Sequence, residues 1–306
     1  MHNLFETIIK ESTNESIISV SEIKKGFSSD KKYVVTTKSK REFLVKLADA
    51  KEFTRKEKEF NVHVQAFNQN VKTNEPIIFR KHNDYCLSVF SYIKGLDASE
   101  VLPRLSVEEQ YNIGYSAGKE LRKIHTIKPN HSMNWYEERK SKYERYWSQY
   151  QDSNVRLEGM DKIHTFIMYN LSLIIGRPIS IQHDDFQVNN IIIENNKYAG
   201  VIDFNRFDIG DPIHDFYKLG QFSREVSVPF SVGQIDGYYE NNVPNHFWEL
   251  YNLYIAMIIV PSIVWSVKVT PQLVDEMLIR LQNMINDQET FSSPIPKWYM
   301  DFKSAY

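Results

Sequence analysis

The sequence predicts an α+β fold in which a strand-rich first part is followed by a longer and mainly helical part. Residues 41–47 and 85–90 carry the alternating apolar, aromatic and β-branched side chains typical of strands. From Ser106 onward, apolar residues recur instead at helical spacing. A chain of 306 residues with 42% hydrophobic content can bury a large core, arranged as one domain or as two lobes.

Within the first part, residues 53–67 predict a helix, because Phe53, Phe60, Val64 and Phe67 repeat at helical intervals. Residues 25–35 suggest two short strands joined by a serine-containing turn. The single cysteine, Cys86, lies in the apolar run 85–90 and excludes an intrachain disulfide. We expect it to pack in a reducing compartment.

In the second part, Ser106 and Glu109 have the spacing of a capping box and begin a helix that continues to Ile124. The apolar run 253–264 is shorter than the roughly 20 residues needed to cross a bilayer, so we expect a buried helix. Four aromatic residues share one face of a predicted helix, namely Tyr136, Tyr143, Trp147 and Tyr150. This pattern predicts that the face is buried against neighbouring helices or, as an alternative, that it forms a wall that stacks on rings of the substrate.

The most informative segment is the loop that begins at His183. Asp185 follows two residues later, Asn190 follows five residues after that, and Asp203 ends a later apolar run. This HxDxxxxN spacing is typical of phosphoryl transferases. There the aspartate orients an attacking hydroxyl, while the asparagine and the later aspartate hold magnesium. We therefore predict Asp185 as the catalytic residue that also contacts the substrate, and Asn190 and Asp203 as metal ligands.

Each of these residues has a simpler explanation when it is taken alone. Asp185 and Asn190 favour turns between strands, and His183 can be a core histidine bonded to a backbone carbonyl. The simple explanations do not account for the joint spacing with Asp203. For His183 we expect the structural role even within an active site, because apolar residues flank it.

These motifs resemble those of the aminoglycoside phosphotransferase and choline kinase family, small-molecule kinases that share the protein kinase fold. The resemblance covers about residues 20 to 220 and includes Gly210-Asp211-Pro212 and Asp215. It implies a bilobal protein-kinase-like fold, with an antiparallel-sheet nucleotide-binding lobe with one helix at residues 1–92 and a mainly helical catalytic lobe at 93–306. It also implies that Asp211 and Asp215 support the catalytic loop. The family usually has glycine where this chain has Asp184, which is tolerable if the backbone there needs no positive φ.

The resemblance further implies a nucleotide site in the first lobe. Lys46 would pair with nucleotide phosphates, and Glu57 would fix that lysine, with Glu59 as the second candidate. Ser28 and Ser29 lie in the turn that would cover the phosphates. Backbone groups of Ser91 and Ile93 would bind the adenine edge at the hinge between the lobes. The resemblance thus implies six nucleotide-binding positions: Lys46, Glu57, Ser28, Ser29, Ser91 and Ile93.

The function implied is transfer of the terminal phosphate of ATP or GTP, with Mg²⁺, to a hydroxyl of an antibiotic, with an aminoglycoside as the leading candidate. A macrolide kinase and a metabolic kinase for choline, an amino alcohol or a sugar remain open. A nucleotide-binding pseudokinase is a further alternative, although a binding module has no need of Asp185. Glu225 is a carboxylate that could face the substrate.

Charge limits the possible partners. The formal net charge of −2 argues against obligatory nucleic-acid binding. Residues 1–60 hold 13 Lys and Arg against 10 Asp and Glu, whereas residues 181–215 hold 2 against 7. The acidic second segment suits magnesium and a cationic substrate. The amino terminus lacks the pattern of a signal peptide, so we expect a cytoplasmic protein without a membrane partner.

Overall fold

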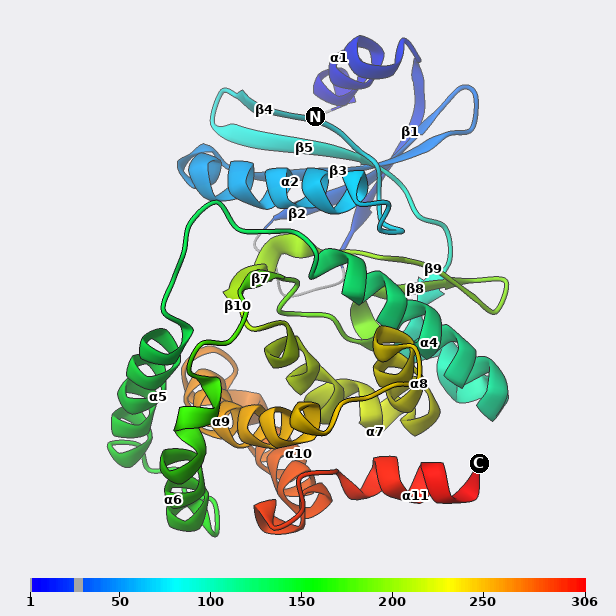
Figure 1. Ribbon diagram of the computed structural model, residues 1–306. Helices are drawn as coiled ribbons and strands as arrows, with labels where there is room; N and C mark the ends of the chain where they lie inside the picture. The colour runs from blue at the N-terminus through cyan, green and yellow to red at the C-terminus, as the bar shows by residue number, and fades with distance from the viewer. Residues whose placement is uncertain (1, 25–29) are drawn as a thin grey trace.

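The computed structural model describes residues 2–24 and 30–306 (Figure 1). The first part of the chain forms a five-stranded antiparallel sheet in the order β1-β2-β3-β5-β4. Two of its strands include the predicted runs 41–47 and 85–90. The strands are β1 Ile17–Ile23, β2 Lys31–Thr37, β3 Glu42–Asp49, β4 Pro76–His82 and β5 Tyr85–Ser91.

Two helices pack against this sheet. The predicted helix is α2, Phe53–Asn68, which lies below the sheet in Figure 1. A second helix, α1 His2–Thr13, lies above it and was not predicted from the sequence. The apolar side of α1 shares a small core with alternate residues of β3, namely Phe43, Val45 and Leu47. Because side chains alternate along a strand, Lys46 must point to the opposite face, on which α2 lies.

The remainder of the chain is mainly helical and contains two small sheets. One sheet has the order β6-β8-β9 and the other pairs β10 with β7. The predicted lobe boundary at residue 92 follows β5 directly and stays a prediction. The elements are β6 Leu96–Asp97, α3 Ala98–Val101, α4 Val107–Ile124, α5 Trp135–Gln151, α6 Met160–Asn170, β7 Ser180–Gln182, β8 Ile191–Glu194, β9 Lys197–Val201, β10 Asp208–Gly210, α7 Arg224–Val226, α8 Val228–Tyr239, α9 Asn245–Val269, α10 Val274–Asp287 and α11 Lys297–Ala305.

The helix α4 begins at the predicted capping box. The side chain of Ser106 accepts a bond from the Glu109 backbone, and the Glu109 carboxylate accepts one from the Ser106 backbone. Farther along, α4 packs against α8 through glycines on both helices. A Cβ added at Gly118 would lie 2.1 Å from the Gln234 carbonyl oxygen, and one at Gly237 would lie 2.0 Å from the Tyr115 carbonyl oxygen. The two backbones therefore approach too closely for any side chain at these positions.

The predicted buried run 253–264 lies inside α9. Among the described residues, α9 is the one helix long and apolar enough to cross a membrane, yet 78% of its most apolar window is buried. Its side chains belong to the large core, together with those of α4, α5 and α8. The hydrophobicity of α9 is thus used in packing, and the helix supplies one wall of the site described below.

The glycine contacts predict the effect of adding one methyl group. Gly118→Ala should lower the free energy of unfolding by about 1–3 kcal/mol or more, because the methyl group meets the backbone of α8. Alanine would otherwise favour a helix interior over glycine by about 1 kcal/mol. Urea unfolding of Gly118→Ala and of Asn112→Ala, at an exposed position on the same helix, provides the comparison. Equal stability of the two variants would contradict the close approach of α4 and α8.

Candidate active site

One buried carboxylate holds the catalytic loop. The two oxygens of Asp215, which is fully buried, accept backbone N–H bonds from His183 at 2.8 Å and Asp184 at 2.7 Å. The His125 ring lies 3.0 Å from one of the same oxygens and contacts the Tyr238 hydroxyl through its other nitrogen. The backbone of the loop is therefore fixed from the large lobe. The bond from His125 could not be read from the sequence, because it joins residues 90 positions apart.

The imidazole of His183 connects the loop to the strand that leads to Asp203. Its Nε2 lies 3.1 Å from the Ile202 carbonyl oxygen, and its Nδ1 accepts a 3.3 Å bond from the Asp185 backbone N–H. With Nδ1 as acceptor, Nε2 carries the proton and the ring is neutral. Burial lowers the pKa of His183 despite the neighbouring carboxylates of Asp215 and Asp185, which agrees with a neutral ring.

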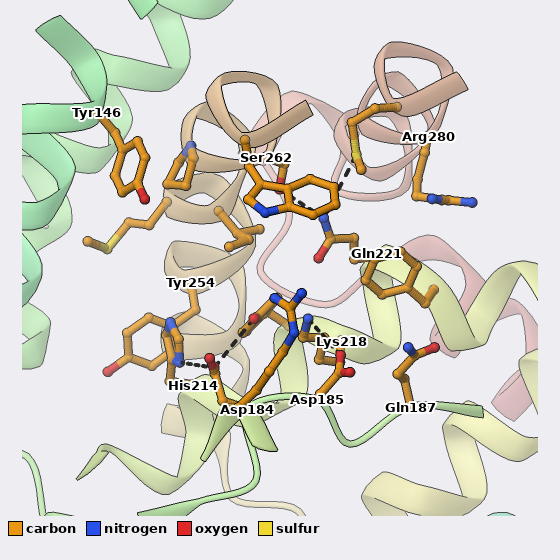
Figure 2. A pocket seen from close by; sticks show the side chains of 18 of the residues that line it. Tyr146, Asp184, Asp185, Gln187, His214, Lys218, Gln221, Tyr254, Ser262 and Arg280 are labelled. Atoms are coloured by element: carbon orange, nitrogen blue, oxygen red, sulfur yellow. Dashed lines mark hydrogen bonds and ion pairs between the residues drawn. The ribbon is translucent and has the colours of Figure 1, made fainter. Parts of the chain in front are cut away.

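Both oxygens of the Asp185 side chain have partners. The Asn190 side-chain amide donates to Oδ2 at 2.9 Å and also to the Asp185 carbonyl. The Lys218 ammonium lies 3.0 Å from Oδ1, as the pair near the floor of Figure 2 shows. Burial alone would raise the pKa of Asp185, but the charge and hydrogen bond of Lys218, together with further nearby groups such as Arg206, outweigh it and keep the pKa below its ordinary value. Asp185 is therefore held as a carboxylate. No sequence motif identified Lys218.

Asp203 lies between two lysines of the small lobe. Its oxygens lie 3.1 Å from Lys46 Nζ and 3.2 Å from Lys32 Nζ. Burial would raise the pKa of Asp203, but the two ammonium groups hold it well below the ordinary range. Lys32 was not predicted, although it pairs with Lys46 across β2 and β3. Residues that pair across neighbouring strands point to the same face of the sheet. The pairing of β2 with β3 therefore places both lysines on one face, but this pairing was not known from the sequence.

The carboxylate beside Lys46 is that of Glu59, and the prediction of Glu57 is wrong. Glu59 is buried, and its Oε1 lies 3.9 Å from Lys46 Nζ, while its other oxygen lies 3.0 Å from Lys56 Nζ. Glu57 is exposed on α2. Positions 57 and 59 differ by about 200° around a helix, so only one of them can face the sheet. Lys56 also pairs with Asp30, which links α2 to the start of β2.

The other predicted nucleotide contacts have different outcomes. Ser28 and Ser29 lie outside the described residues. The Ser91 backbone N–H donates to the Glu75 carbonyl at 2.8 Å, and the Ser91 carbonyl accepts from the Asn74 side chain at 2.7 Å. Both Ser91 groups are thus already used within the protein. Ile93 lies in the link between β5 and β6, and its adenine contact stays a prediction.

The residues available for a metal are oxygen donors. The Asp203 carboxylate and the Asn190 amide oxygen suit magnesium, which prefers oxygen ligands and accepts phosphate and water as the remainder. Among residues 2–24 and 30–306, no cluster of three or more His, Cys, Asp or Glu could hold a metal alone. The oxygen donors of Asp203 and Asn190 fit the chemistry of magnesium, and their role as its ligands stays a prediction.

Comparison with known proteins agrees with this geometry. The model of a family described as the phosphotransferase enzyme family matches residues 19–246. This chain belongs to that family. The match includes the sheet, the catalytic loop and α8. No curated protein matches the sequence of this phosphotransferase.

Solved structures show the same fold. Aminoglycoside phosphotransferase APH(2'')-Ib, ADP-bound, is 18% identical to this phosphotransferase, with 92% of this chain and 97% of that chain covered and a TM-score of 0.64. The streptomycin-ATP-APH(2'')-IIa ternary complex is 19% identical, with 97% of each chain covered and a TM-score of 0.62. A thermostable mutant of APH(4)-Ia with AMP-PNP and hygromycin B is 11% identical, with 92% and 97% covered and a TM-score of 0.69. The predicted kinase-like fold class is confirmed.

A cavity of about 380 Å³ lies beside Asp185. The catalytic loop and Lys218 line its floor in Figure 2, while Tyr146, Ser262 and Arg280 lie on the opposite side. Its walls come from α5, α9 and α10, three helices of the large lobe. A small molecule in this cavity would therefore meet the carboxylate of Asp185 directly. The cavity is the candidate acceptor site of the phosphotransferase.

Two further predictions concern the surroundings of this cavity. Glu225 does not line it, and instead pairs at 2.9 Å with Arg280, which does. Asp211 is fully buried and accepts from Arg177 at 2.7 Å and from the Tyr254 hydroxyl at 2.8 Å. Glu225 therefore has no position for substrate contact in this arrangement, whereas the bonds of Asp211 tie β10 to α9.

The aromatic face of α5 is used in packing. Tyr143 and Tyr150 are buried in the large core, and Trp147 stacks on the His164 ring with centroids 4.2 Å apart. Tyr143 also lines the candidate acceptor cavity, together with Tyr146. Burial is therefore confirmed for Tyr143 and Tyr150, whereas stacking on substrate rings stays a prediction.

Asp184 occupies a strained and desolvated position. Its φ of 56° is left-handed, so the condition that the backbone there needs no positive φ is not met. Aspartate is one of the few residues besides glycine that adopt this conformation readily. Burial raises the pKa of Asp184 to about 7, and the neighbouring Lys218 lowers it only in part. The carboxyl group is therefore partly protonated near neutral pH.

This pKa predicts a pH-dependent cost to folding. Between its ordinary pKa of 3.8 and about 7, the unfolded chain loses the Asp184 proton while the folded chain keeps it. The free energy of unfolding therefore falls as the pH rises through this window. Asp184→Asn removes the titrating carboxyl group and with it this pH dependence. Asparagine also tolerates positive φ. We expect the variant's gain in melting temperature over the wild type to grow from pH 4 to pH 7 and then level off. A gain that is constant across this range would contradict the raised pKa.

Proposed function

We propose that this protein is a small-molecule kinase that transfers the terminal phosphate of ATP or GTP to a hydroxyl group. The observation that carries the proposal is the position of the Asp185 carboxylate, which faces a cavity large enough for a small molecule and is held as an anion by Lys218. A carboxylate in that place can accept a hydrogen bond from an acceptor hydroxyl and align it for in-line attack. Cytoplasmic location accords with this role.

The proposed donor site lies at the junction of the lobes. Lys46 and Lys32 would contact the nucleotide phosphates, with Glu59 fixing Lys46. Asn190 and Asp203 would hold Mg²⁺, whose contribution when bound is to neutralise charge on the phosphates. Asp185 would orient the hydroxyl, and the loop bonds of Asp215 and His183 would keep it in register. The protein's contribution is then mainly positioning and charge neutralisation.

For the acceptor, the similar structures named above favour an aminoglycoside, since their complexes contain streptomycin or hygromycin B. Another complex among the similar structures contains spectinomycin. A second candidate is a metabolic kinase whose acceptor carries fewer positive charges. One observation favours it: the cavity is lined by five Lys and Arg residues but only three Asp and Glu residues. Of the seven acidic residues in segment 181–215, only Asp184 and Asp185 line the cavity.

The base assignment predicts separable effects on chemistry and binding. Asp185→Asn should lower kcat by about 10²- to 10⁴-fold, because the amide cannot accept the proton of the hydroxyl. Nucleotide affinity should stay within about threefold, since the donor site is otherwise intact. Steady-state kinetics with the best acceptor and titration with a nonhydrolysable nucleotide give the two values. Near-normal turnover of Asp185→Asn would remove Asp185 from the reaction.

The corrected partner of Lys46 allows a matched test on one helix. Glu59→Gln should lower kcat/KM for the nucleotide by about tenfold or more, because Lys46 loses the charge that fixes it. Glu57→Gln makes the same chemical change on the exposed side of α2 and should leave kcat/KM unchanged. If the two variants behave alike, or if Glu57→Gln is the impaired one, Glu59 does not position the lysine.

A further inference from the structure

The α5 side of the acceptor cavity carries two cations, Arg139 and Lys142. They are three residues apart on α5, so they lie on the same helix face. Both line the cavity that also contains Asp185. Of the other three cations in the lining, Lys218 is paired with Asp185 and Arg280 with Glu225. The third, Arg206, lies outside α5, and its charge acts on Asp185.

Neither Arg139 nor Lys142 has hydrogen-bond partners within the described chain for all of its N–H donors. Arg139 is 8% exposed, and its buried Nε has no hydrogen-bond partner among the residues that the structure describes. Its guanidinium packs 4.3 Å above the Trp135 ring, and the carboxylate of Asp208 lies 3.7 Å away, beyond hydrogen-bond length. For Lys142, no hydrogen bond or ion pair to any described residue is found, and burial beside Arg139 lowers its pKa.

The nearby side chain of His214 does not neutralise the charges of Arg139 and Lys142. His214 is buried, its Nδ1 has no hydrogen-bond partner in the described chain, and its Nε2 lies 3.5 Å from an Arg139 nitrogen. Burial and the nearby cations Arg139, Lys142 and Lys218 lower the pKa of His214, which is therefore neutral. The one nearby carboxyl group in the lining, Asp184, lies 3.8 Å from His214 Nδ1. This end of the cavity thus has more donors than acceptors.

Unpaired donors in a partly buried site cost free energy until an acceptor binds. A carboxylate or phosphate oxygen would satisfy both a guanidinium and an ammonium group, in the pairing that arginine favours. An acceptor with several ammonium groups would instead place like charges together. The donor phosphates have their own cations, Lys46 and Lys32, beside Asp203.

We propose that Arg139 and Lys142 form an anion subsite of the acceptor cavity, which binds a carboxylate or phosphate group of a hydroxylated small molecule. The inference rests on the proposed kinase function, in which that molecule is the phosphate acceptor. The acceptor would then carry a negative charge that binds on the α5 side of the cavity that Asp185 also lines.

Four sugars with the glucose configuration provide the test. D-glucuronate carries a carboxylate, D-glucose carries no charge and D-glucosamine carries an ammonium group, while D-glucose 6-phosphate supplies the phosphate arm. Binding to the full chain is measured by ligand-observed NMR in low salt, with and without saturating Mg–AMP-PNP to occupy the donor site. We expect glucuronate, glucose 6-phosphate or both to bind at least tenfold more tightly than glucosamine in both conditions.

A matched pair of variants locates the site. Lys142→Met should weaken the preferred anionic sugar at least fivefold, whereas Lys140→Met, on the same helix but outside the cavity lining, should not change its affinity. The inference is overturned by equal or tighter binding of glucosamine, by binding that Lys142→Met leaves unchanged, or by no binding of either anionic sugar. Loss of anion binding on addition of AMP-PNP would also overturn it, because the donor site would then be the anion site.

Failure of the kinase proposal gives a different pattern. In that case either Mg–AMP-PNP does not bind, or it binds and no acceptor is phosphorylated, as in a pseudokinase. The anion titrations without nucleotide report on Arg139 and Lys142 in both situations. If the nucleotide binds and an aminoglycoside is phosphorylated while the anionic sugars do not bind, the kinase proposal stands and the anion subsite does not.

Discussion

The arrangement of the site depends on the carboxylate of Asp215. Its two oxygens bind consecutive backbone amides, at His183 and Asp184, and this bond pair is possible only if the chain turns sharply there. Asp184 accordingly has a positive φ, and Asp185 is carried out of the core toward the cavity. Because Asp215 is itself fully buried, it must keep these partners, since an unpaired buried carboxylate would be strongly unfavourable. The loop is rigid for that reason.

The same constraint joins the two halves of the active site. The His183 ring, fixed by the loop, contacts the Ile202 carbonyl, and Asp203 is the next residue. Asp203 in turn pairs with Lys46 and Lys32 of the small lobe. Buried bonds therefore connect Asp215 to the proposed phosphate-binding lysines through the catalytic loop. Each contact joins two groups that lie side by side in space, and together the contacts extend from the large lobe to the small lobe.

The sequence predicted what depends on local spacing. The loop motif places Asp185 and Asn190 five residues apart, and in the structure the asparagine amide donates to both the carbonyl and the carboxylate of the aspartate. The choice between Glu57 and Glu59 was missed, because the regularly spaced apolar residues do not mark the buried face of α2. Phe53, Phe60 and Val64 are only half-buried and Phe67 is exposed. The buried side carries Lys56, Glu59, Val62, His63 and Ala66. Lys218 comes from a segment 33 residues after Asp185, and nothing in its immediate sequence indicates the contact. The helix α1 was likewise missed.

Charge along the chain proved a poor guide to charge in the cavity. Three of the seven acidic residues of 181–215 form internal bonds away from the cavity: Asp215 braces the loop, Asp211 binds Arg177, and Asp203 pairs with two lysines. The cations of the lining come instead from α5, α10 and the segments around the catalytic loop. Which acceptor binds is thus decided by residues that are distant in sequence and meet only in the folded chain.

The most direct measurement of the central claim is a ³¹P NMR time course of the purified protein with magnesium, ATP or GTP, and a panel of acceptors. The panel comprises aminoglycosides, macrolides, choline, neutral sugars and anionic sugars. Transfer to a hydroxyl predicts that a phosphate monoester signal of one acceptor grows in step with the nucleoside diphosphate. Nucleotide consumption that yields only inorganic phosphate, or no consumption with any member of the panel, would contradict it.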